Sequence, residues 1–258
     1  MKNLIALLLA FLCLAWGQEN LAESRIITLV ADEWPPFNGK PCSQKEGYLV
    51  DVARAVFEEQ GYQVDYQLVP WARAINMTRL GQADGAIGAS RTDAPDFIFP
   101  EEELARNKLA FYTRKGDPWR FAGPSSVEGV TLGTIAGYDY RPWLLDYIAA
   151  NRDNTRKVQI LHGNEPLQRN ITKLLAGRID VVVDNEAAIL SVAAEMGALE
   201  QISCAGYGDE TSFIYIAFSP AKPESPAVAA LLSRGIAAMR EDGRLRAILA
   251  RYNLSDWQ

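Results

Sequence analysis

The chain has 258 residues, of which 48% are hydrophobic and 22% are charged. This length fits two domains of ordinary size, and the apolar fraction is large enough for packed cores and excludes a disordered chain. The net charge of −6 argues against binding to nucleic acid or to anionic membranes, because both favour basic surfaces.

Residues 1–17 have the features of a cleaved secretory signal. Lys2 precedes an apolar run at 4–15, and small residues stand two positions apart at the end of that run. A buried or membrane-anchoring helix is the alternative, but the run is shorter than the ~20 residues that span a bilayer. We therefore expect cleavage after Gly17, export to the periplasm and no membrane insertion.

The first part of the mature chain alternates between strand and helix patterns. Val64, Tyr66 and Leu68 alternate along one face of a strand, whereas the apolar residues after Gly47 recur at helical spacing. The expected elements are strand 25–31, helix 47–60, strand 62–68, helix 70–80 and strand 85–88.

The remainder of the chain continues this alternation, which predicts largely parallel sheets flanked by helices. The expected strands are 108–113, 130–135, 158–161, 181–183 and 213–218. The expected helices are 140–149, 167–176, 186–196, 227–239 and 244–252.

A short pattern occurs twice, at 80–84 and at 176–180. In both places a glycine closes a helix, and an aspartate three residues further on precedes an apolar strand. A strand and a helix precede each copy in the same order. The repetition predicts two lobes of similar construction.

The order and spacing of several motifs resemble the bacterial extracellular solute-binding proteins of family 3. The motifs are Asp-Glu-Trp-Pro-Pro-Phe at 32–37, Gly-Tyr-Leu-Val-Asp-Val at 47–52, Gly-Thr-Ile-Ala-Gly at 133–137 and the two repeats above. The resemblance covers about residues 26–252. It implies an α/β, two-lobed periplasmic-binding-protein fold of type II, with each lobe a mainly parallel sheet. The chain would cross near 104–108 and 206–212, so that 24–104 and 212–258 form lobe 1 and 105–211 form lobe 2.

The resemblance also implies a ligand pocket between the lobes. An aromatic residue after the first strand would stack on the ligand, although either tryptophan of the pocket can instead belong to a core. The second lobe would offer main-chain N–H groups at a helix N-terminus, unless Asp139 caps them. The residues carried over are Trp34, Trp71, Arg73, Ser90, Arg91, Gly137, Tyr138 and Asn185.

Two departures from the family pattern concern the ligand. No arginine stands in 92–96, where amino-acid-binding members hold the α-carboxylate, and Arg91 is the nearest substitute. Asn185 stands where those members hold the α-ammonium with an aspartate, and Asp184 would point away along a continuous strand. An ordinary α-amino acid is therefore not the expected ligand; a sugar, an aromatic acid, a modified amino acid or a quaternary amine suits the aromatic walls better.

Few other residues indicate chemistry. Cys42 and Cys204 can pair in an oxidising compartment, or they are two unrelated thiols. His162 is the only histidine and is expected in a loop, so we expect no metal site and no cofactor.

We expect a monomeric, non-enzymatic protein that delivers a small solute to the permease of an ABC transporter. A sensor that reports the same solute to a membrane receptor is an alternative. An enzyme resembling cyclohexadienyl dehydratases is a second alternative, with Glu186 or Asp184 as general acid.

Overall fold

The computed structural model describes residues 25–257, except for the side chains of 209–211. The predicted signal peptide at 1–17 lies outside the described residues. Eight strands form one continuous sheet in the order β2-β1-β3-β8-β4-β7-β5-β6. The strands are β1 (Arg25–Ala31), β2 (Tyr62–Leu68), β3 (Gly85–Ala89), β4 (Ala105–Arg114), β5 (Leu132–Ile135), β6 (Val158–Leu161), β7 (Val181–Asn185) and β8 (Ile202–Phe218).

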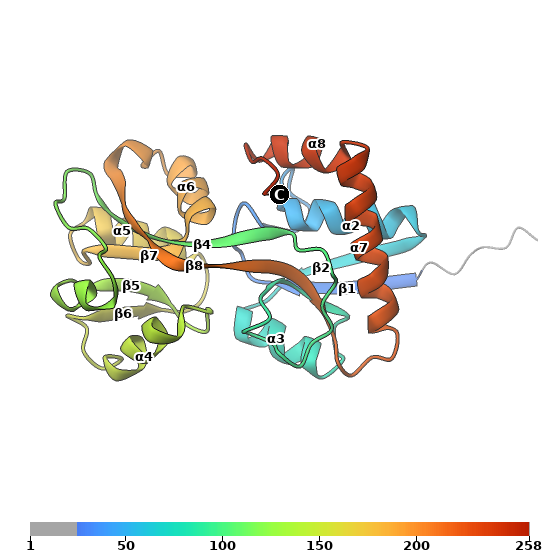
Figure 1. Ribbon diagram of the computed structural model, residues 1–258, viewed down its shortest axis with the longest axis horizontal. Coiled ribbons are helices and arrows are strands. Elements are labelled where there is room, and N and C mark those ends of the chain that lie inside the picture. Colours follow the sequence, from blue (N-terminus) through green and yellow to red (C-terminus); the bar gives the residue numbers. More distant parts are fainter. Residues whose placement is uncertain (1–24, 258) are drawn as a thin grey trace, which may run out of the picture.

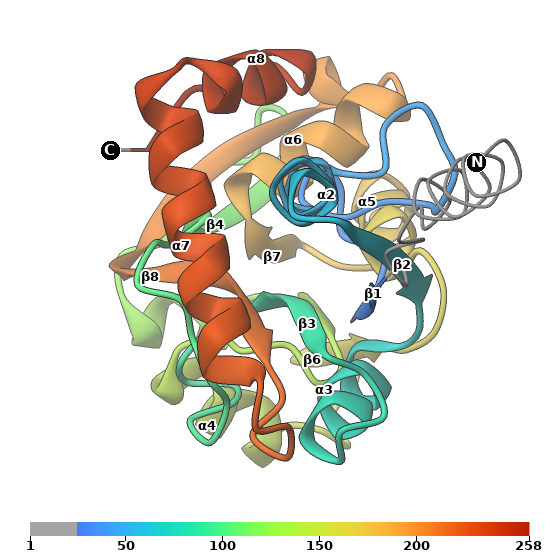
Figure 2. The ribbon, with the colours of Figure 1, turned by 90° about the vertical axis from the view of Figure 1, so that its right-hand side faces the viewer.

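Within residues 25–257, seven α-helices flank this sheet, with two 3₁₀ helices, η1 (Pro124–Gly129) and η2 (Leu199–Gln201), between other elements. The α-helices are α2 (Tyr48–Glu59), α3 (Trp71–Arg79), α4 (Pro142–Ala150), α5 (Pro166–Leu175), α6 (Glu186–Glu195), α7 (Ser225–Glu241) and α8 (Arg244–Arg251). Figures 1 and 2 both place α2 and α3 on opposite sides of β1.

The elements gather into two groups, which β4 and β8 join (Figure 1). We call β1–β3 with α2, α3, α7 and α8 the first lobe, and β5–β7 with α4–α6 the second lobe. Within each lobe the strand pairs β1–β2, β1–β3, β5–β6 and β5–β7 are parallel. Every antiparallel pair involves β4 or β8, the two strands that pass between the lobes. The predicted α/β, two-lobed arrangement with two crossings is confirmed.

Helix α2 shows how the sequence pattern builds the first lobe. Its apolar residues Leu49, Val52, Val56 and Phe57 are all buried in the core, as the helical spacing predicts. The helix begins directly after Gly47, whose φ is +106°. A side chain at this position is excluded, because its Cβ atom would lie 2.4 Å from the Cα atom of Asn38. The glycine thus lets the loop that carries the first cavity residues turn tightly into the helix.

The two Gly-x-x-Asp repeats have the same structural role in the two lobes. Asp84 accepts a hydrogen bond from the Thr28 N–H (2.6 Å) and pairs with Lys222. Asp180 accepts one from the Thr131 N–H (2.9 Å). Each aspartate therefore ties the start of one parallel strand to the neighbouring strand, which accounts for its recurrence before β3 and β7.

Most element boundaries lie within two residues of the expectation, and three of the differences bear on the crossings and the cavity. Strand β8 begins at Ile202 rather than at 213, and β4 begins at Ala105 rather than at 108. Both additions are the crossing segments, whose polar and glycine residues hide the strand pattern. Helix α4 begins at Pro142 rather than at 140, because proline favours the first turn of a helix.

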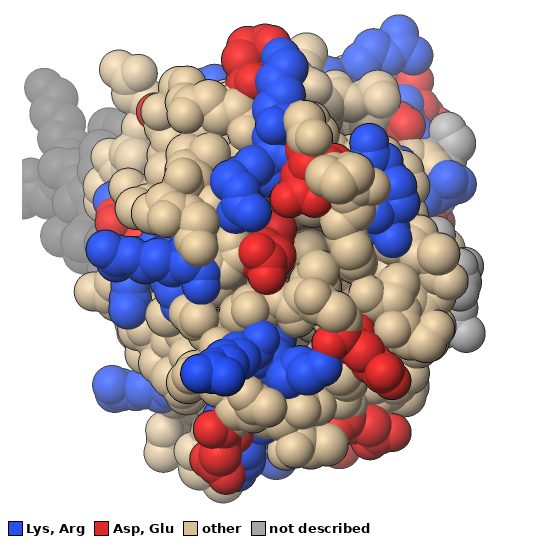
Figure 3. All heavy atoms as spheres, turned by 90° about the vertical axis from the view of Figure 1, so that its left-hand side faces the viewer, with Lys and Arg blue, Asp and Glu red and all other residues tan. Residues whose placement is uncertain are grey.

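The molecular surface is mixed in character. On the end of the second lobe that Figure 3 shows, Lys and Arg side chains are interspersed with Asp and Glu. Among residues 25–257, no helix combines the length and the apolar character that a membrane span requires.

Candidate functional site

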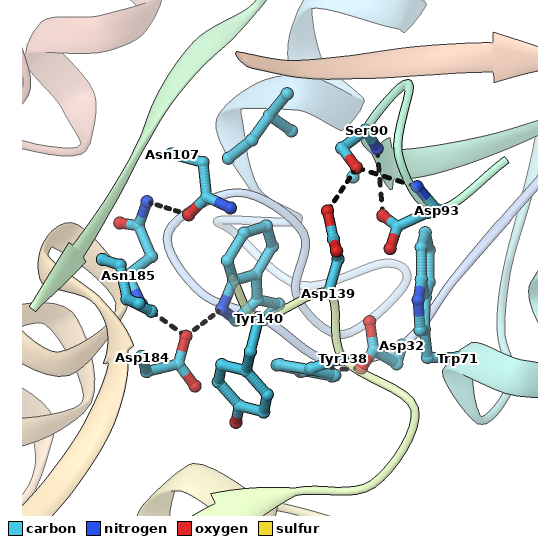
Figure 4. Close-up of a pocket in the computed structure, with 14 residues that line it drawn as sticks. Asp32, Trp71, Ser90, Asp93, Asn107, Tyr138, Asp139, Tyr140, Asp184 and Asn185 are labelled. Atoms are coloured by element: carbon cyan, nitrogen blue, oxygen red, sulfur yellow. Dashed lines mark hydrogen bonds between the residues drawn. The ribbon is translucent and has the colours of Figure 1, made fainter. Parts of the chain in front are cut away.

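A cavity lined by both polar and aromatic side chains lies between the two lobes, beside the strands that join them (Figure 4). Counted together with its opening to solvent, it holds about 520 Å³ of space free of atoms. The lining residues come from both lobes and from the crossing strands. They are Asp32, Trp34, Trp71, Gly88, Ser90, Asp93, Asn107, Leu109, Tyr138, Asp139, Tyr140, Asp184, Asn185 and Ile214.

The loop after β1 positions Asp32 and Trp34 on the first-lobe wall. The Trp34 N–H donates to the Asn38 main-chain oxygen (2.8 Å), and the indole packs against Phe37 with a centroid distance of 4.3 Å. A Cβ atom on Gly88 would lie 3.7 Å from the indole, which is an ordinary contact, so glycine is favoured beside the ring by its φ of +98° rather than by lack of space. The tryptophan is thus held by both its main chain and its ring.

A tight turn after β3 supplies the other polar groups of the first-lobe wall. The Ser90 N–H donates to Asp93 Oδ2 (3.0 Å), and the Asp93 N–H donates to Ser90 Oγ (3.1 Å). Trp71, the first residue of α3, is 9% exposed and completes this wall. The reciprocal hydrogen bonds fix both side chains at the carboxyl end of the strand.

The second-lobe wall also follows strand ends. Tyr138, Asp139 and Tyr140 lie between β5 and α4, and Tyr140 is fixed by the Ile135 N–H, which donates to its hydroxyl (2.9 Å). Asp184 and Asn185 end β7 and are 2% and 3% exposed. Ligands of α/β folds commonly bind at the carboxyl ends of parallel strands, and both walls occupy such ends.

Side chains from the two walls bond directly to one another. Trp34 Nε1–H donates to Asp184 Oδ1 (3.1 Å), and the Tyr138 hydroxyl donates to Asp32 Oδ2 (2.8 Å). The Ser90 hydroxyl donates to Asp139 (2.7 Å), as Figure 4 shows. At the rim, Lys40 pairs with Glu165 (3.1 Å). The lobes are therefore closed on one another in this structure.

The cavity is strongly acidic. Burial raises the pKa of Asp184 to about 7, and burial together with the nearby Asp139 carboxylate raises the pKa of Asp93 to about 7. Burial likewise raises the pKa of Asp32 to about 6, against the hydrogen bond from Tyr138, which favours its ionised form. None of the lining residues is a lysine, arginine or histidine. The carboxyl groups thus lack a basic partner within the lining.

Five of the eight residues carried over from the family pattern line this cavity: Trp34, Trp71, Ser90, Tyr138 and Asn185. The amide of Asn185 is fully engaged with the protein. Its Nδ2 donates to Asn107 Oδ1 (3.1 Å) and to the Arg106 main-chain oxygen (3.3 Å), and its Oδ1 accepts from the Ala187 N–H (2.9 Å). Asn185 therefore caps α6 as well as forming part of the wall.

The other three residues lie elsewhere. Arg91 places its guanidinium over the rings of Phe99 and Tyr215, 4.9 Å and 5.0 Å from their centroids, instead of in the cavity. Arg73 is exposed on the outer side of α3, and Gly137 is exposed in the turn after β5. The anion grips expected from Arg91 and from a helix N-terminus are thus not part of this cavity.

Two sequence-based expectations about orientation are wrong. Tyr138 and Tyr140 precede α4 rather than open it, so Asp139 does not cap that helix and instead accepts from Ser90 across the cavity. Asp184 does not point away from the cavity. Its neighbour Asn185 turns to cap α6, and Asp184 lines the cavity beside it.

Sequence reasoning missed Asp93, Asn107, Leu109 and Ile214 as cavity residues, and it named Asp32 only as part of the motif around Trp34. The Ser-x-x-Asp spacing at 90–93, directly after a strand, is a signal for a hydroxyl–carboxylate turn that could have indicated Asp93. The other three lie on β4 and β8, whose approach to the cavity depends on how the lobes meet.

The remaining candidate residues take no part in the cavity. Cys42 and Cys204 are both free, the first in the loop before α2 and the second in β8, so the structure contains no disulfide between them. His162 is exposed after β6, as expected. Within residues 25–257, no group of three or more His, Cys, Asp or Glu residues could hold a metal ion.

Several solved structures with the same fold are distant from this chain in sequence. One described for glutathione import via GshT and the cystine ABC importer TcyBC of Streptococcus mutans is 18% identical, with a TM-score of 0.75 over 90% of this chain and 98% of that one. A substrate-binding protein of an ABC uptake transporter from Streptococcus pneumoniae, with bound histidine, is 18% identical, with a TM-score of 0.72 over 88% and 92%.

A third structure is a histidine kinase sensor domain with similarity to periplasmic binding proteins, 20% identical, with a TM-score of 0.70 over 89% of this chain and 96% of that one. No curated protein sequence matches the chain. The profile of the family-3 bacterial extracellular solute-binding proteins matches residues 26–255, nearly all of the described chain. The fold is that of type II periplasmic binding proteins, and the chain belongs to the bacterial extracellular solute-binding proteins of family 3.

Proposed function

We propose that this protein captures a small polar or aromatic solute in the cavity between its lobes and presents it to the permease of an ABC transporter. The carrying observation is that side chains of the two lobes meet around one cavity lined by carboxyl, amide and aromatic groups. A solute bound there contacts both lobes only when they are closed. Its binding energy therefore favours the closed form, whose outer surface a membrane partner can recognise.

The proposal includes the site of action and the division of the chain. We infer a periplasmic, monomeric protein whose signal peptide at 1–17 is removed. Lobe 1 comprises 24–104 and 212–258, and lobe 2 comprises 105–211. The family is extracellular or periplasmic, and the two transporter-associated relatives support delivery to an importer.

Sensing is a second candidate, favoured by the similarity to the histidine kinase sensor domain. Transport and sensing use the same closed form, so the cavity serves both. Deletion of the gene separates them: loss of uptake of the solute supports transport, whereas intact uptake with a lost transcriptional response supports sensing.

Catalysis is less well supported by the cavity. Glu186, one of the two general acids considered, does not line the cavity. Its carboxylate accepts hydrogen bonds from Lys108 (2.8 Å) and from the Tyr207 hydroxyl (2.5 Å) instead. Asp184 lines the cavity with a raised pKa, which general acid chemistry can use. Turnover of prephenate or arogenate that is lost in Asp184→Asn would establish an enzyme and overturn the binding proposal.

A thermal-shift screen tests the proposal directly. Amines, amino acids, organic acids and sugars are added singly to the purified mature protein. A true ligand at a hundred times its Kd should stabilise the protein by about 2.7 kcal/mol. Small-angle scattering of the same samples should show a more compact protein with the ligand than without it. The absence of any stabilising solute from all four classes would contradict a solute-binding function.

A further inference from the structure

The charges around the cavity point to the class of its ligand. Asp32 and Asp93 line it from the first lobe, and Asp139 and Asp184 line it from the second. Closure therefore brings acidic groups of one lobe against those of the other, and burial together with the Asp139 carboxylate raises the pKa of Asp93. A closed form of this kind is stabilised by a positive charge between the walls, and an anion would add to the repulsion.

One carboxylate oxygen is buried and lacks any partner. Asp184 is 2% exposed, and its Oδ1 accepts from Trp34 Nε1–H (3.1 Å) and from the Asn185 N–H (2.6 Å). Its Oδ2 is buried without a hydrogen bond, although Asp184 lines the cavity. A buried carboxylate oxygen needs a donor, and a ligand N–H or a cationic centre would satisfy it.

Nearby basic side chains are engaged outside the cavity lining. The Arg91 guanidinium lies over two aromatic rings, and Lys108 pairs with Glu186 (2.8 Å). Arg141, which is close to the cavity residue Asn107, donates to the Asn107 main-chain oxygen (3.4 Å) and does not line the cavity. A carboxylate on the ligand would thus meet acidic groups without a cation from the lining to receive it.

The aromatic walls favour the same charge. Trp34, Trp71, Tyr138 and Tyr140 line the cavity, and the faces of such rings attract cations through their negative quadrupole. The indole of Trp34 and the ring of Tyr138 meet edge to face at 6.1 Å. Rings at such an angle present one face and one edge, which suits a compact cationic head more than an extended planar ligand.

We propose that the solute is a small organic cation without a carboxylate, such as an amine, a guanidine or a quaternary ammonium compound. Asp184 and Asp93 hold the positive centre from the two lobes, and the aromatic rings cover its apolar part. This inference rests on the proposed solute-binding function and narrows it. It also explains the sequence: the anion grip of amino-acid-binding relatives is missing because this ligand has no carboxylate to hold.

Matched pairs of solutes test the proposal by titration calorimetry at pH 7.5. Agmatine is compared with arginine, cadaverine with lysine, tyramine with tyrosine and choline with glycine betaine, since the members of each pair differ chiefly by a carboxylate. We expect at least one cation to bind a hundredfold or more tightly than its carboxylated partner. Glucose, citrate and calcium chloride complete the panel as a neutral solute, an anion and a metal ion.

The outcomes separate the two levels of the argument. If an amino acid, another acid or a sugar binds while no organic cation does, the proposed solute-binding function stands and the cation proposal is overturned. If only the metal ion binds, the cation proposal is overturned and the proposed function changes to metal-ion binding. If no solute of any class binds, both fail. Equal affinity for a cation and its carboxylated partner also overturns the proposal, because the acidic lining should reject the carboxylate.

Three variants identify the groups that hold the cation. Asp184→Asn should weaken binding of the tightest cation about 30-fold or more, because it removes a buried charge opposite the ligand. Asp93→Asn serves as a second variant from the other lobe, should Asp184→Asn not fold. Asp153→Asn changes an exposed aspartate of the second lobe outside the cavity and should leave the affinity within twofold. Unchanged affinity in both cavity variants would overturn the proposal.

Discussion

The aspartates at the two ends of the parallel strands have opposite environments. Asp84 and Asp180 precede β3 and β7, where each accepts a main-chain N–H and pairs with a basic side chain, Lys222 or Arg114. At the other end of β7, Asp184 has no basic partner in the cavity lining and one oxygen without a hydrogen bond.

This difference separates a structural role from a binding role for the same residue type. A paired aspartate stabilises the fold because its charge is compensated locally. An aspartate that is buried without a cation destabilises the closed, empty protein, and that instability is relieved when a positive ligand arrives. The partner of a side chain is therefore more informative about function than its residue type.

The largest expected effect is a loss of stability when Asp84, which pairs with Lys222, is replaced. Asp84→Ala removes the acceptor of the Thr28 N–H and the partner of Lys222, and should lower the free energy of unfolding by about 2–3 kcal/mol. Urea denaturation at pH 7.5 measures this change. Asp84→Asn keeps an acceptor for the Thr28 N–H and should lose less than half as much. If Asp84→Ala unfolds at the same urea concentration as the wild type, Asp84 does not stabilise the fold in the way proposed.

Truncation of Trp34 in the first lobe should have the next largest effect, on the affinity for the solute. Trp34→Ala removes a wall of the cavity and the hydrogen bond to Asp184, and should weaken binding of the tightest solute by about 2 kcal/mol, roughly 30-fold. Calorimetric titration gives the affinity. Trp119→Ala is the control, since Trp119 lies outside the cavity and donates to the Ser126 main-chain oxygen. Equal losses in both variants would exclude Trp34 from ligand contact.

Asp184, which has no basic partner in the cavity lining, predicts a particular pH dependence of stability. The pKa of Asp184 is about 7 in the folded protein and 3.8 for an unperturbed aspartate, so the folded protein binds this proton more tightly than the unfolded chain. Its contribution to stability is complete below about pH 4 and is lost as the pH rises towards 7. Without ligand, the free energy of unfolding should fall by about 1 kcal/mol between pH 6 and pH 8 for this group.

Urea denaturation at several pH values measures this slope, and Asp184→Asn should make it shallower. Asp93 and Asp32 have raised pKa values as well, so part of the slope should remain in that variant. If the free energy of unfolding has the same pH dependence in the variant and the wild type, ionisation of Asp184 does not destabilise the folded protein. The contrast between the two strand ends would then disappear.

The smallest effect is expected for the arginines that sequence reasoning placed in the pocket. Arg91→Gln and Arg73→Gln should each change solute affinity by less than about 0.5 kcal/mol, because neither side chain lines the cavity. The same titration measures both. A tenfold loss of affinity in Arg91→Gln would mean that its guanidinium leaves the rings of Phe99 and Tyr215 to contact the ligand.

Most of the fold could be predicted because the lobes follow local rules. The helical spacing in α2, the alternation in β2 and the glycines that close α3 and α5 all act within a few residues. The crossing half of β8 could not be predicted in this way. Its sequence lacks alternation, and it is a strand because it pairs with β4, which lies far away in the sequence.

The site was predictable to the extent that it depends on strand ends. Trp34, Ser90 and Tyr138 each follow a strand of a parallel sheet, and such positions converge. The direction of a side chain depends on tertiary partners instead. Arg91 turns to the rings of Phe99 and Tyr215, and Tyr215 lies far away in the sequence. Asp184 lines the cavity beside Asn185, which caps α6, and the sequence alone does not show how the second lobe turns this strand end towards the first.

The pairing of β4 with β8 bears on how the solute is released. Their ladder is interrupted between Lys108, opposite Thr211, and Ala110, opposite Tyr207, where three residues of β8 face a single residue of β4. A two-stranded ribbon bends most easily where its ladder is broken, so the lobes can swing apart there while the hydrogen bonds on either side remain intact. The connection would then contribute little to the balance between the open and closed forms. A membrane partner would need only to disturb the few contacts across the cavity to release the cargo.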